Sequence, residues 1–304
     1  MTHAPDITHT ASASPAALVA GTSLWVDAWK RLRKNRMAVA GGLVLVALTM
    51  ACMVGPTLIA ATWGYDEATQ DLAYGPRPPS LAHPFGTDFY GRDLLTRVLA
   101  GTRVSLTVGI LAALVAATIG TVYGAVAAYA GGLADSVMMR VVDILYALPS
   151  MFLVIILVTL VGKSLLLVFL ALGAVGWLLT ARIVRGQVLS LKEQDFVLAA
   201  RSLGTSAQDI VFRHLIPNAL GPVIVTFTLT VPAMVLQEAF LSFLGLGVQA
   251  PRASLGALIS DGANQMLVFW WTLVFPGGVM ALMLFALNFL GDGVRDALDP
   301  RMKH

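Results

Sequence analysis

Charge is what this sequence has least of. Asp, Glu, Lys and Arg make up 12% of its 304 residues, whereas hydrophobic residues make up 57%. A typical soluble domain is about 25% charged, so this chain has roughly half the ionised surface that such a domain needs. Apolar runs of about 20 residues, the length that crosses a bilayer, occupy much of the chain instead. We therefore predict an all-α membrane protein with one polytopic domain, and not one or two soluble domains.

Cysteine is also scarce. The single Cys52 lies inside an apolar run, where it has no partner for an intrachain disulfide and no second ligand at metal-binding spacing. The simplest interpretation is a small buried hydrophobe. The net charge of +3 comes from basic residues that flank the apolar runs, so it does not indicate a nucleic-acid-binding face.

Motifs of catalysis and nucleotide binding are absent from the sequence as well. Gly162-Lys163-Ser164 is similar to the end of a phosphate-binding loop, but Leu157 stands where that loop needs its first glycine. The stretch from Gly245 to Ala250 imitates a dinucleotide fingerprint, but it follows an apolar span and not a strand. The sequence contains no His-Glu-x-x-His pair, nucleophile elbow or Cys/His cluster. We predict no catalytic residue, no metal and no cofactor in this chain.

The N-terminal region contains two different segments. Residues 1–22 are rich in Ala, Ser, Thr and His without periodicity, which predicts a disordered cytoplasmic tail. In residues 23–36, Trp25, Trp29 and Leu32 recur at helical spacing, and basic residues occupy the other side. This pattern predicts an amphipathic helix at the membrane interface.

Six transmembrane helices are predicted within a domain that covers 37–296. The expected spans are 37–62, 103–130, 141–161, 165–182, 219–245 and 268–290. Of the 20 Lys and Arg residues, 14 then fall on the side of the N-terminus and 6 on the other side. The positive-inside rule places the N-terminus and the C-terminal segment 297–304 in the cytoplasm. The loop 195–217 is then cytoplasmic, and the longest connection, 63–102, is an outer loop.

The outer loop has two halves of different character. Its first half is rich in proline and irregular, and its second half reads GTDFYGRDLLTRVLAG, which predicts a brief helix that starts near Asp93. A second outer segment, residues 247–266, is expected to lie along the membrane surface.

Small residues recur every four positions in the second predicted span. They are Ala112, Ala116, Gly120, Gly124 and Ala128. Such a face lets another helix approach closely. The pattern leaves open whether the partner helix belongs to this chain or to another subunit.

An acidic residue in the fifth predicted span is a candidate functional group, because burying a charge in lipid is costly. Glu238 follows Pro222 and Pro232, which can kink this helix. Two interpretations stay open: a carboxylate on the translocation path or at a subunit interface, and a structural residue hydrogen-bonded inside the bundle. Asp143 and Asp292 lie near predicted cytoplasmic ends, so we expect them at the interface.

The cytoplasmic loop 195–217 is patterned as two short helices joined at a glycine. In the first helix, apolar and small residues at spacings of three and four fall near one face: Phe196, Ala199, Ala200 and Leu203. Gly204 suits the end of this helix. Ser206 and Asp209 form a variant of a capping box at the start of the second helix. Pro217 is expected to stop that second helix.

The second short helix of this loop also has an apolar side. Its members are Ile210, Val211 and Leu215. Arg213 and His214 complement the negative end of the helix dipole. The two helices can serve as a docking element for a partner or as a linker packed on their own bundle, and the residues alone favour the first only slightly.

The spacing of this loop resembles the EAA loop of ABC importer permeases. Ala199, Ala200 and Gly204 match the Glu-Ala-Ala-x3-Gly pattern, and Pro217 matches its later proline. Leu198 departs from the pattern, because it replaces the glutamate. The ending is similar to that of dipeptide and oligopeptide permeases; its residues are His214, Pro217 and Asn218.

Other stretches resemble the second, C-type permease subunit of the same transporters. HPFGTDFYGRDLLTRVLAGTRVSL is similar to its outer segment, DILYALPSMFL to the start of its third span and EAFLSFLGLG to the end of its fifth. The outer-loop motif consists of Gly86, Thr87, Asp88, Gly91, Arg92 and Asp93.

The resemblance implies a type I ABC importer transmembrane domain (MetI-like) in a bacterial inner membrane. The expected function is import of dipeptides or oligopeptides, with nickel or glutathione as alternative cargoes. Expected partners are a homologous permease subunit, two ATPase subunits that bind ATP and Mg²⁺, and an external solute-binding protein. The residues assigned to ATPase coupling are Ala199, Ala200, Gly204, Ser206, Asp209, His214 and Pro217. A secondary transporter that acts alone is the alternative from another class.

Overall fold

The computed structural model describes residues 24–162, 164–249 and 251–298. The predicted tail 1–22 and most of the C-terminal segment 297–304 lie outside the described residues, as do Lys163 and the side chain of Trp25. The regular structure of the described part is helical, apart from an isolated bridge between Thr87 and Asp93.

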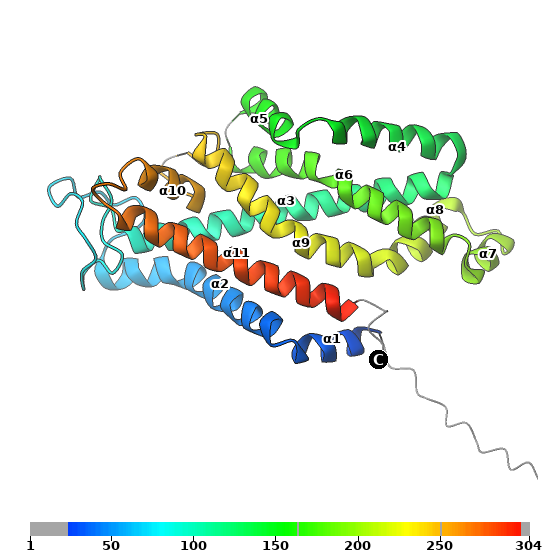
Figure 1. Ribbon diagram of the computed structural model, residues 1–304, viewed down its shortest axis with the longest axis horizontal. Coiled ribbons are helices and arrows are strands. Elements are labelled where there is room, and N and C mark those ends of the chain that lie inside the picture. Colours follow the sequence, from blue (N-terminus) through cyan, green and yellow to red (C-terminus); the bar gives the residue numbers. More distant parts are fainter. Residues whose placement is uncertain (1–23, 163, 250, 299–304) are drawn as a thin grey trace, which may run out of the picture.

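The helices follow one another in a simple order (Figure 1). They are α1 (Leu24–Lys34), α2 (Arg36–Trp63), α3 (Leu94–Ala130), α4 (Gly132–Ala147), α5 (Ser150–Val161), α6 (Leu165–Leu191), α7 (Asp195–Ser202), α8 (Ala207–Asp209), the π-helix η1 (Ile210–Leu215), α9 (Ile216–Phe243), α10 (Leu255–Ala263) and α11 (Trp271–Leu298). Within the described residues, five helical stretches are long and apolar enough to cross a membrane, and six if α4 and α5 count as one bent span. The prediction of an all-α membrane protein is confirmed.

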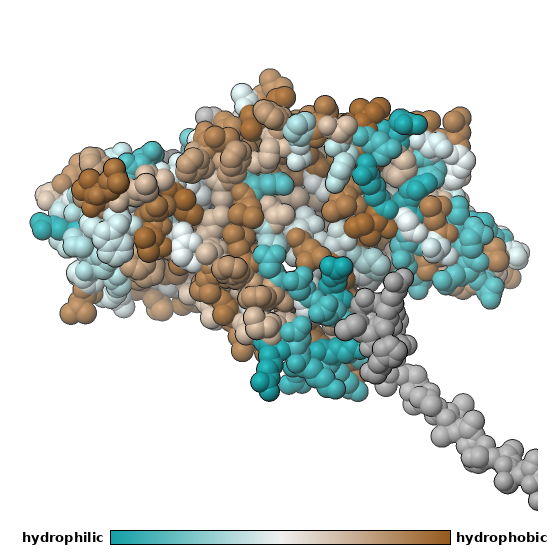
Figure 2. Space-filling model, viewed as in Figure 1, coloured by the Kyte–Doolittle hydropathy of each residue, from teal (hydrophilic) through white to brown (hydrophobic). Residues whose placement is uncertain are grey.

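The bundle is organised around α3. This helix packs most extensively against α6 and also contacts α9, while α11 packs between α2 and α9. The segment 64–93 and α10 lie at one end of the bundle, which we call the α10 end, and α7 lies at the other, the α7 end (Figure 1). Large apolar side chains are exposed along the length between the two ends, where Figure 2 shows a broad hydrophobic surface. This surface is what a lipid-embedded bundle requires.

The brief helix predicted in the outer loop starts as expected after Asp93, and it is continuous with the span predicted from residue 103, so that both form the single helix α3. Asp93 caps α3 at Leu94, and no helix-breaking residue interrupts the following turns. At a rise of about 1.5 Å per residue, the 37 residues of α3 span roughly 55 Å, beyond the ~30 Å hydrocarbon core of a bilayer. One end of α3 must therefore project from the membrane.

The third predicted span is divided into two helices. α4 and α5 meet at an angle of 87° around Pro149. Leu148, which precedes the proline, has an extended backbone with ψ of 139°, as steric contact with a proline ring favours. The single helix expected over 141–161 is therefore wrong.

Two boundaries at the α7 end also differ from the prediction. α6 continues to Leu191, about two turns beyond the predicted end at residue 182. Pro217 does not stop the helix that begins at Ala207, because η1 leads directly into α9. Before the proline, the amide of Ile216 donates to the carbonyl of Val211, five residues back. This wider π-helical turn gives the proline ring room, and the helix runs unbroken to Phe243.

The small-residue face of α3 is filled by α6 of the same chain. A Cβ added to Gly120 would lie 2.7 Å from the carbonyl oxygen of Trp177, and one added to Gly124 would collide with the backbone of Ala181. Both glycines are buried. The close helix contact that the spacing predicted is thus an intrachain one, and these two positions leave no surface for a second subunit.

α1 lies beside α11 and is amphipathic. Ala28 is buried, while Trp29 has 59% of its surface exposed. Leu32 approaches the position of Gly293 on α11. α1 therefore packs on the bundle through one side and leaves Trp29, Lys30, Arg33 and Lys34 exposed. Its placement at the membrane interface stays a prediction.

Candidate functional site

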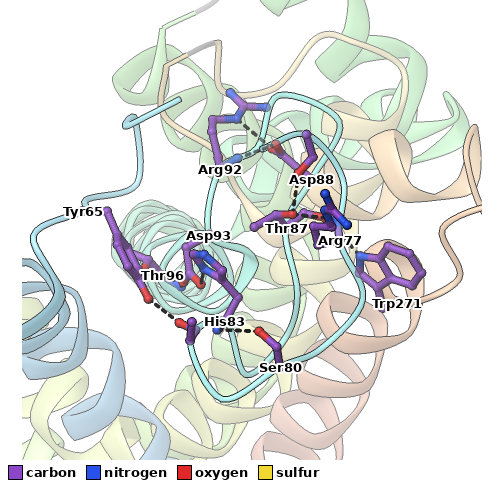
Figure 3. Close-up of polar contacts among 12 residues, drawn as sticks. Tyr65, Arg77, Ser80, His83, Thr87, Asp88, Arg92, Asp93, Thr96 and Trp271 are labelled. Carbon is purple, nitrogen blue, oxygen red and sulfur yellow. Dashed lines mark hydrogen bonds and ion pairs between the residues drawn. The ribbon is translucent and has the colours of Figure 1, made fainter. Parts of the chain in front are cut away.

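The outer-loop motif, residues 86–93, is the most tightly connected segment outside the helices (Figure 3). Thr87 is fully buried, and its hydroxyl donates to the carbonyl of Gly75 at 2.8 Å and accepts from the amide of Arg77 at 2.8 Å. The indole of Trp271 donates to the carbonyl of Thr87 at 3.0 Å, which ties the motif to the start of α11. The hydrogen bonds of Thr87 thus fix the first part of the motif against the segment before it and against α11.

Two glycines of the motif occupy positions that other residues cannot adopt easily. Gly91 has φ of +70°, and a Cβ there would collide with the backbone of Asp71. Gly86 has φ of +78°, and its Cβ would lie 2.6 Å from the carbonyl oxygen of Arg77. Both the left-handed backbone and the close approach require glycine.

Asp93 connects the motif to α3. One carboxylate oxygen accepts hydrogen bonds from the amide and the hydroxyl of Thr96, both at 2.7 Å. The other oxygen lies 3.0 Å from Nδ1 of His83. Tyr65 lies against the ring of His83, and burial together with the nearby charge of Asp93 raises the pKa of Tyr65 to about 12. One aspartate therefore fixes both the start of a helix and the fold of the preceding loop.

The carboxylate of Asp88 lies close to two arginines, Arg92 and Arg97. Its Oδ1 accepts from the amides of Tyr90 and Arg92, and its Oδ2 accepts from Nε of Arg92 at 2.7 Å. Nε of Arg97 lies 3.4 Å from the same Oδ2 but forms no hydrogen bond within the described chain. Arg92 and Arg97 are both more than 90% buried, so this cluster carries an excess positive charge away from bulk water.

A cavity of about 600 Å³ adjoins this cluster at the α10 end. Its walls come from the outer-loop motif, the end of α9, and α10 with the turns that flank it. Asp261 of α10 lines the cavity, and desolvation raises the pKa of its carboxyl although Arg97 and Arg92 act in the opposite direction. The cavity wall is polar and apolar in similar measure, and it brings together charges that are far apart in the sequence.

Glu238 is fully buried near the same end. Its two carboxyl oxygens accept hydrogen bonds from Ser105 of α3 at 2.8 Å and from Ser242 at 2.7 Å. Ser242 also accepts from Ser254, and Ser105 accepts from the amide of Leu255 at the start of α10. This geometry favours the structural interpretation of Glu238, because the carboxyl joins α3, α9 and α10 and has no exposed surface.

At the α7 end, the first helix of the loop 195–217 buries only part of its apolar surface. Val197 and Ala200 are buried, whereas Ala199 and Phe196 are exposed. The exposed fraction of Leu203 is 86%. Phe196, Ala199 and Leu203 therefore lie on one exposed side of α7, and Ala200 lies at its border with the bundle, as residues at spacings of three and four do.

The corner between the two helices of this loop is as predicted. Gly204 has φ of +78° and ends α7. Ser206 caps the next helix: its hydroxyl accepts from the amide of Asp209 at 3.1 Å and donates to the Asp209 carboxylate at 2.7 Å. The buried side of this second helix is also confirmed and consists of Ile210, Val211 and Leu215. His214 and Pro217 lie on its partly or fully exposed side.

An ion pair near the α7 end was missed by the sequence analysis. Nε and Nη2 of Arg185 each donate at 2.6 Å to one oxygen of Asp135, which joins α4 to α6. The predicted span ended at residue 182, which put Arg185 in a loop. Asp143 pairs with Arg182 at 2.8 Å nearby, but both side chains are exposed. Asp292 is exposed as well. The interfacial place of Asp143 and Asp292 stays a prediction.

Metal binding has no support in the described part of the chain. Residues 24–162, 164–249 and 251–298 contain no group of three or more His, Cys, Asp or Glu side chains that could hold a metal ion. Cys52 is buried and free there, as predicted.

Comparison with protein families gives two matches. Residues 120–304 match the family described as "Binding-protein-dependent transport system inner membrane component". Residues 23–80 match the "N-terminal TM domain of oligopeptide transport permease C". Together these matches cover both sides of the outer-loop motif.

Curated relatives match almost the whole chain. The oligopeptide transport system permease protein OppC of Escherichia coli (strain K12) is 52% identical over 283 residues, which cover 93% of each chain. OppC of Bacillus subtilis (strain 168) is 43% identical, covering 92% of this chain and 91% of the relative. The dipeptide transport system permease protein DppC of the same organism is 46% identical, covering 91% and 86%.

Solved structures support the fold. An inward-facing form of the MetNI methionine ABC transporter contains a chain with a TM-score of 0.53 and 19% identity. The match covers 68% of this protein and 96% of that chain. At this identity the likeness concerns the fold alone, which is that of a type I importer transmembrane domain.

Proposed function

This chain belongs to the family of binding-protein-dependent transport system inner membrane components, and on that premise we propose that it moves dipeptides or oligopeptides across a bacterial inner membrane as the permease subunit of an ABC importer. The observation that carries the proposal is the identity of 43–52% with oligopeptide permeases over more than nine tenths of the chain. The five or six candidate spans support it, because a permease must line a path through the bilayer.

The partners follow from this membership. We propose that a homologous permease subunit completes the path, that two ATPase subunits bind ATP and Mg²⁺, and that an external solute-binding protein delivers the peptide. The chain itself supplies no nucleotide-binding motif, so the energy must come from the ATPases. Both termini and α7 lie on the cytoplasmic side in this proposal, and α10 lies outside.

The loop 195–217 is the proposed contact with an ATPase. Phe196, Leu198 and Leu203 expose apolar surface at the α7 end, although polar side chains would be the usual choice for an aqueous surface. A helix with an exposed apolar side fits a groove on a partner protein. Leu198, which stands in place of the family glutamate, adds apolar area to this surface instead of a charge.

The same loop is mechanically coupled to the far end of the bundle. α8, η1 and α9 form one continuous helical stretch from Ala207 to Phe243. Near its far end, Glu238 joins this stretch to α3 and α10 through the serine network. We infer that a displacement of α7 by closing ATPases is transmitted through η1 and the continuous helix α9 toward the α10 end, which is what an alternating-access cycle needs.

A matched pair of surface substitutions tests the docking proposal. Leu203→Asp should abolish co-purification of the ATPase subunits and stop peptide uptake, because a charge would enter an apolar groove. Leu267→Asp is the control, since Leu267 is 94% exposed at the opposite end. It should leave ATPase association unchanged. The docking proposal fails if Leu203→Asp retains both association and uptake.

Energy dependence separates the importer from a secondary transporter. Uptake into vesicles that contain the complete complex should require ATP inside the vesicle and should persist without an ion gradient. Uptake by this chain alone in ATP-free vesicles would contradict the proposal. The cargo is identified by competition: unlabelled peptide should reduce the uptake of labelled peptide, whereas nickel and glutathione should not.

A further inference from the structure

The cavity at the α10 end has the size and chemistry of a binding site. Its volume of about 600 Å³ lies within the range of about 300–1,000 Å³ that is common for small-molecule sites. Charged and amide side chains stand among apolar ones in the part of its wall that the described residues provide. They include Asp88, Arg92, Arg97, Arg252, Asp261 and Gln265.

Arg97 is the least satisfied of these groups. Only 4% of the residue is exposed, and its Nη1 donates a hydrogen bond to the carbonyl of Glu67 at 3.2 Å. Within the described chain, Nε has no hydrogen-bond partner. A buried polar group without a partner costs free energy, so a ligand that supplies an acceptor would bind with advantage.

The charges around Arg97 identify the kind of ligand. Asp88 is the nearest acid, but its Oδ2 already accepts from Arg92 at 2.7 Å, and Arg97 lies 3.4 Å from that same oxygen. One carboxylate thus faces two guanidinium groups. Arg252 adds a further positive charge at an exposed part of the wall. A second carboxylate would balance this excess and could pair with the planar guanidinium in the bidentate manner.

An opposite charge is available in the same cavity. Asp261 lies in the electrostatic field of Arg97 and Arg92, yet it forms no ion pair and no side-chain hydrogen bond within the described residues. It is therefore free to meet an ammonium group. A peptide is the natural molecule that carries a carboxylate at one end and an ammonium at the other.

We propose that this cavity is a peptide-binding site within the permease subunit, in which Arg97 binds the C-terminal carboxylate and Asp261 receives the terminal ammonium. The site rests on the proposed function and adds to it a place where the chain itself holds cargo at the α10 end. Backbone charges are common to all peptides, so such a site accepts many sequences and discriminates against capped ends.

The first experiment needs no substitution. The complete transporter is reconstituted in lipid nanodiscs without the solute-binding protein, and binding of trialanine and of its C-terminal amide is compared by saturation-transfer NMR and titration. The free acid should bind, and the amide should bind about tenfold more weakly or worse, because a charge-assisted hydrogen-bond pair is lost. Equal binding of the two peptides, or no binding of trialanine, overturns the inference.

Substitutions then locate the site. Arg97→Gln should weaken the binding of trialanine until it equals that of trialanine amide to the wild-type protein. Arg97→Lys should restore part of the affinity, since lysine returns the positive charge but not the planar guanidinium group. Arg77→Gln is the control, because Arg77 lies at the same end but outside the cavity wall. Arg252→Gln, on an exposed residue, gives a weaker loss that cannot be ascribed to misfolding of a buried site.

The outcomes also separate this site from its nearest alternative. If Arg97→Gln weakened only the affinity for the solute-binding protein, with no difference between peptide acid and amide, the cavity would receive a protein carboxylate and the inference would be wrong. Peptide uptake by the wild-type transporter is measured in parallel. Normal uptake without trialanine binding refutes this site alone, whereas absent uptake refutes the proposed function.

Discussion

At the α10 end the chain folds back on itself through buried charges, a tryptophan and glycines, whereas at the α7 end it turns at a single glycine and leaves apolar side chains in the open. Thr87, Asp93 and Arg97 are each at least 95% buried at the first end, while Leu203 is 86% exposed at the second. The comparison teaches that the outer-loop motif is held together by contacts within the chain, although Leu81 and Leu267 are exposed elsewhere at the same end. The corner at the α7 end is held by fewer contacts and presents its apolar side chains on a helix.

The largest loss of stability is expected from adding a side chain at Gly91, where the backbone of Asp71 lies closest. Gly91→Ala should destabilise the protein by more than about 3 kcal/mol, because a left-handed backbone and a collision with Asp71 add together. Gly75→Ala should cost only about 1–2 kcal/mol, since φ is +62° there but nothing lies within 4 Å. Thermal unfolding in detergent measures both. Equal costs would show that the loop is not closed as described.

The next effect concerns the buried carboxyl. Glu238→Ala should destabilise the protein by about 3 kcal/mol, because Ser105 and Ser242 lose their acceptor and a cavity remains. Asp292→Ala, at an exposed site toward the α7 end, should change stability by less than about 0.5 kcal/mol. Chemical denaturation of the purified variants gives both values. A small change in the free energy of unfolding for Glu238→Ala would contradict the structural role and favour a place on the translocation path.

Two ion pairs allow a sharper comparison within one region. A double-mutant cycle on Asp135 and Arg185 should give a coupling of about 1.5–3 kcal/mol, because the contact is bidentate and Asp135 is buried. The same cycle on Asp143 and Arg182 should give less than about 1 kcal/mol, since both side chains are exposed to solvent or lipid headgroups. Similar couplings would contradict the role assigned to burial.

The smallest contrast is expected between two helix caps. Ser206→Ala should cost about 1 kcal/mol, the usual value of an exposed N-cap. Ser254→Ala should cost nearer 2 kcal/mol, because Ser254 caps α10 and also donates to Ser242 inside the buried network. Thermal unfolding resolves the difference. If Ser206 proved the costlier site, the α7 end would be more ordered than its contacts indicate.

The sequence predicted features that depend on a few consecutive residues. Gly204 and Ser206 specify the corner of the loop 195–217 because a left-handed position and a cap are local requirements. The apolar runs likewise predicted the existence of the long helices. Their ends were less predictable, since Pro217 continues a helix when a π-helical turn precedes it.

Features that join distant residues escaped prediction. Asp135 and Arg185 are 50 positions apart, and nothing in either local sequence indicates the other. The sequence placed Arg97 in an outer loop, with no sign that it is buried. Its burial depends on the start of α3 at Leu94 and on the segments that pack around that end of the helix. The spacing of Gly120 and Gly124 predicted a close helix contact, but it could not identify which helix makes that contact.

Composition and periodicity by themselves determined that this protein is a bundle of membrane helices with a patterned loop between two of them. Those properties follow from the transfer of apolar side chains out of water and from local backbone preferences, which each segment carries alone. Only the tertiary structure decided that Glu238 is enclosed by serines, that α6 fills the glycine face of α3, and that Arg97 and Asp261 line the same cavity. Electrostatic and packing energies depend on distances between segments, and these distances exist only in the folded chain.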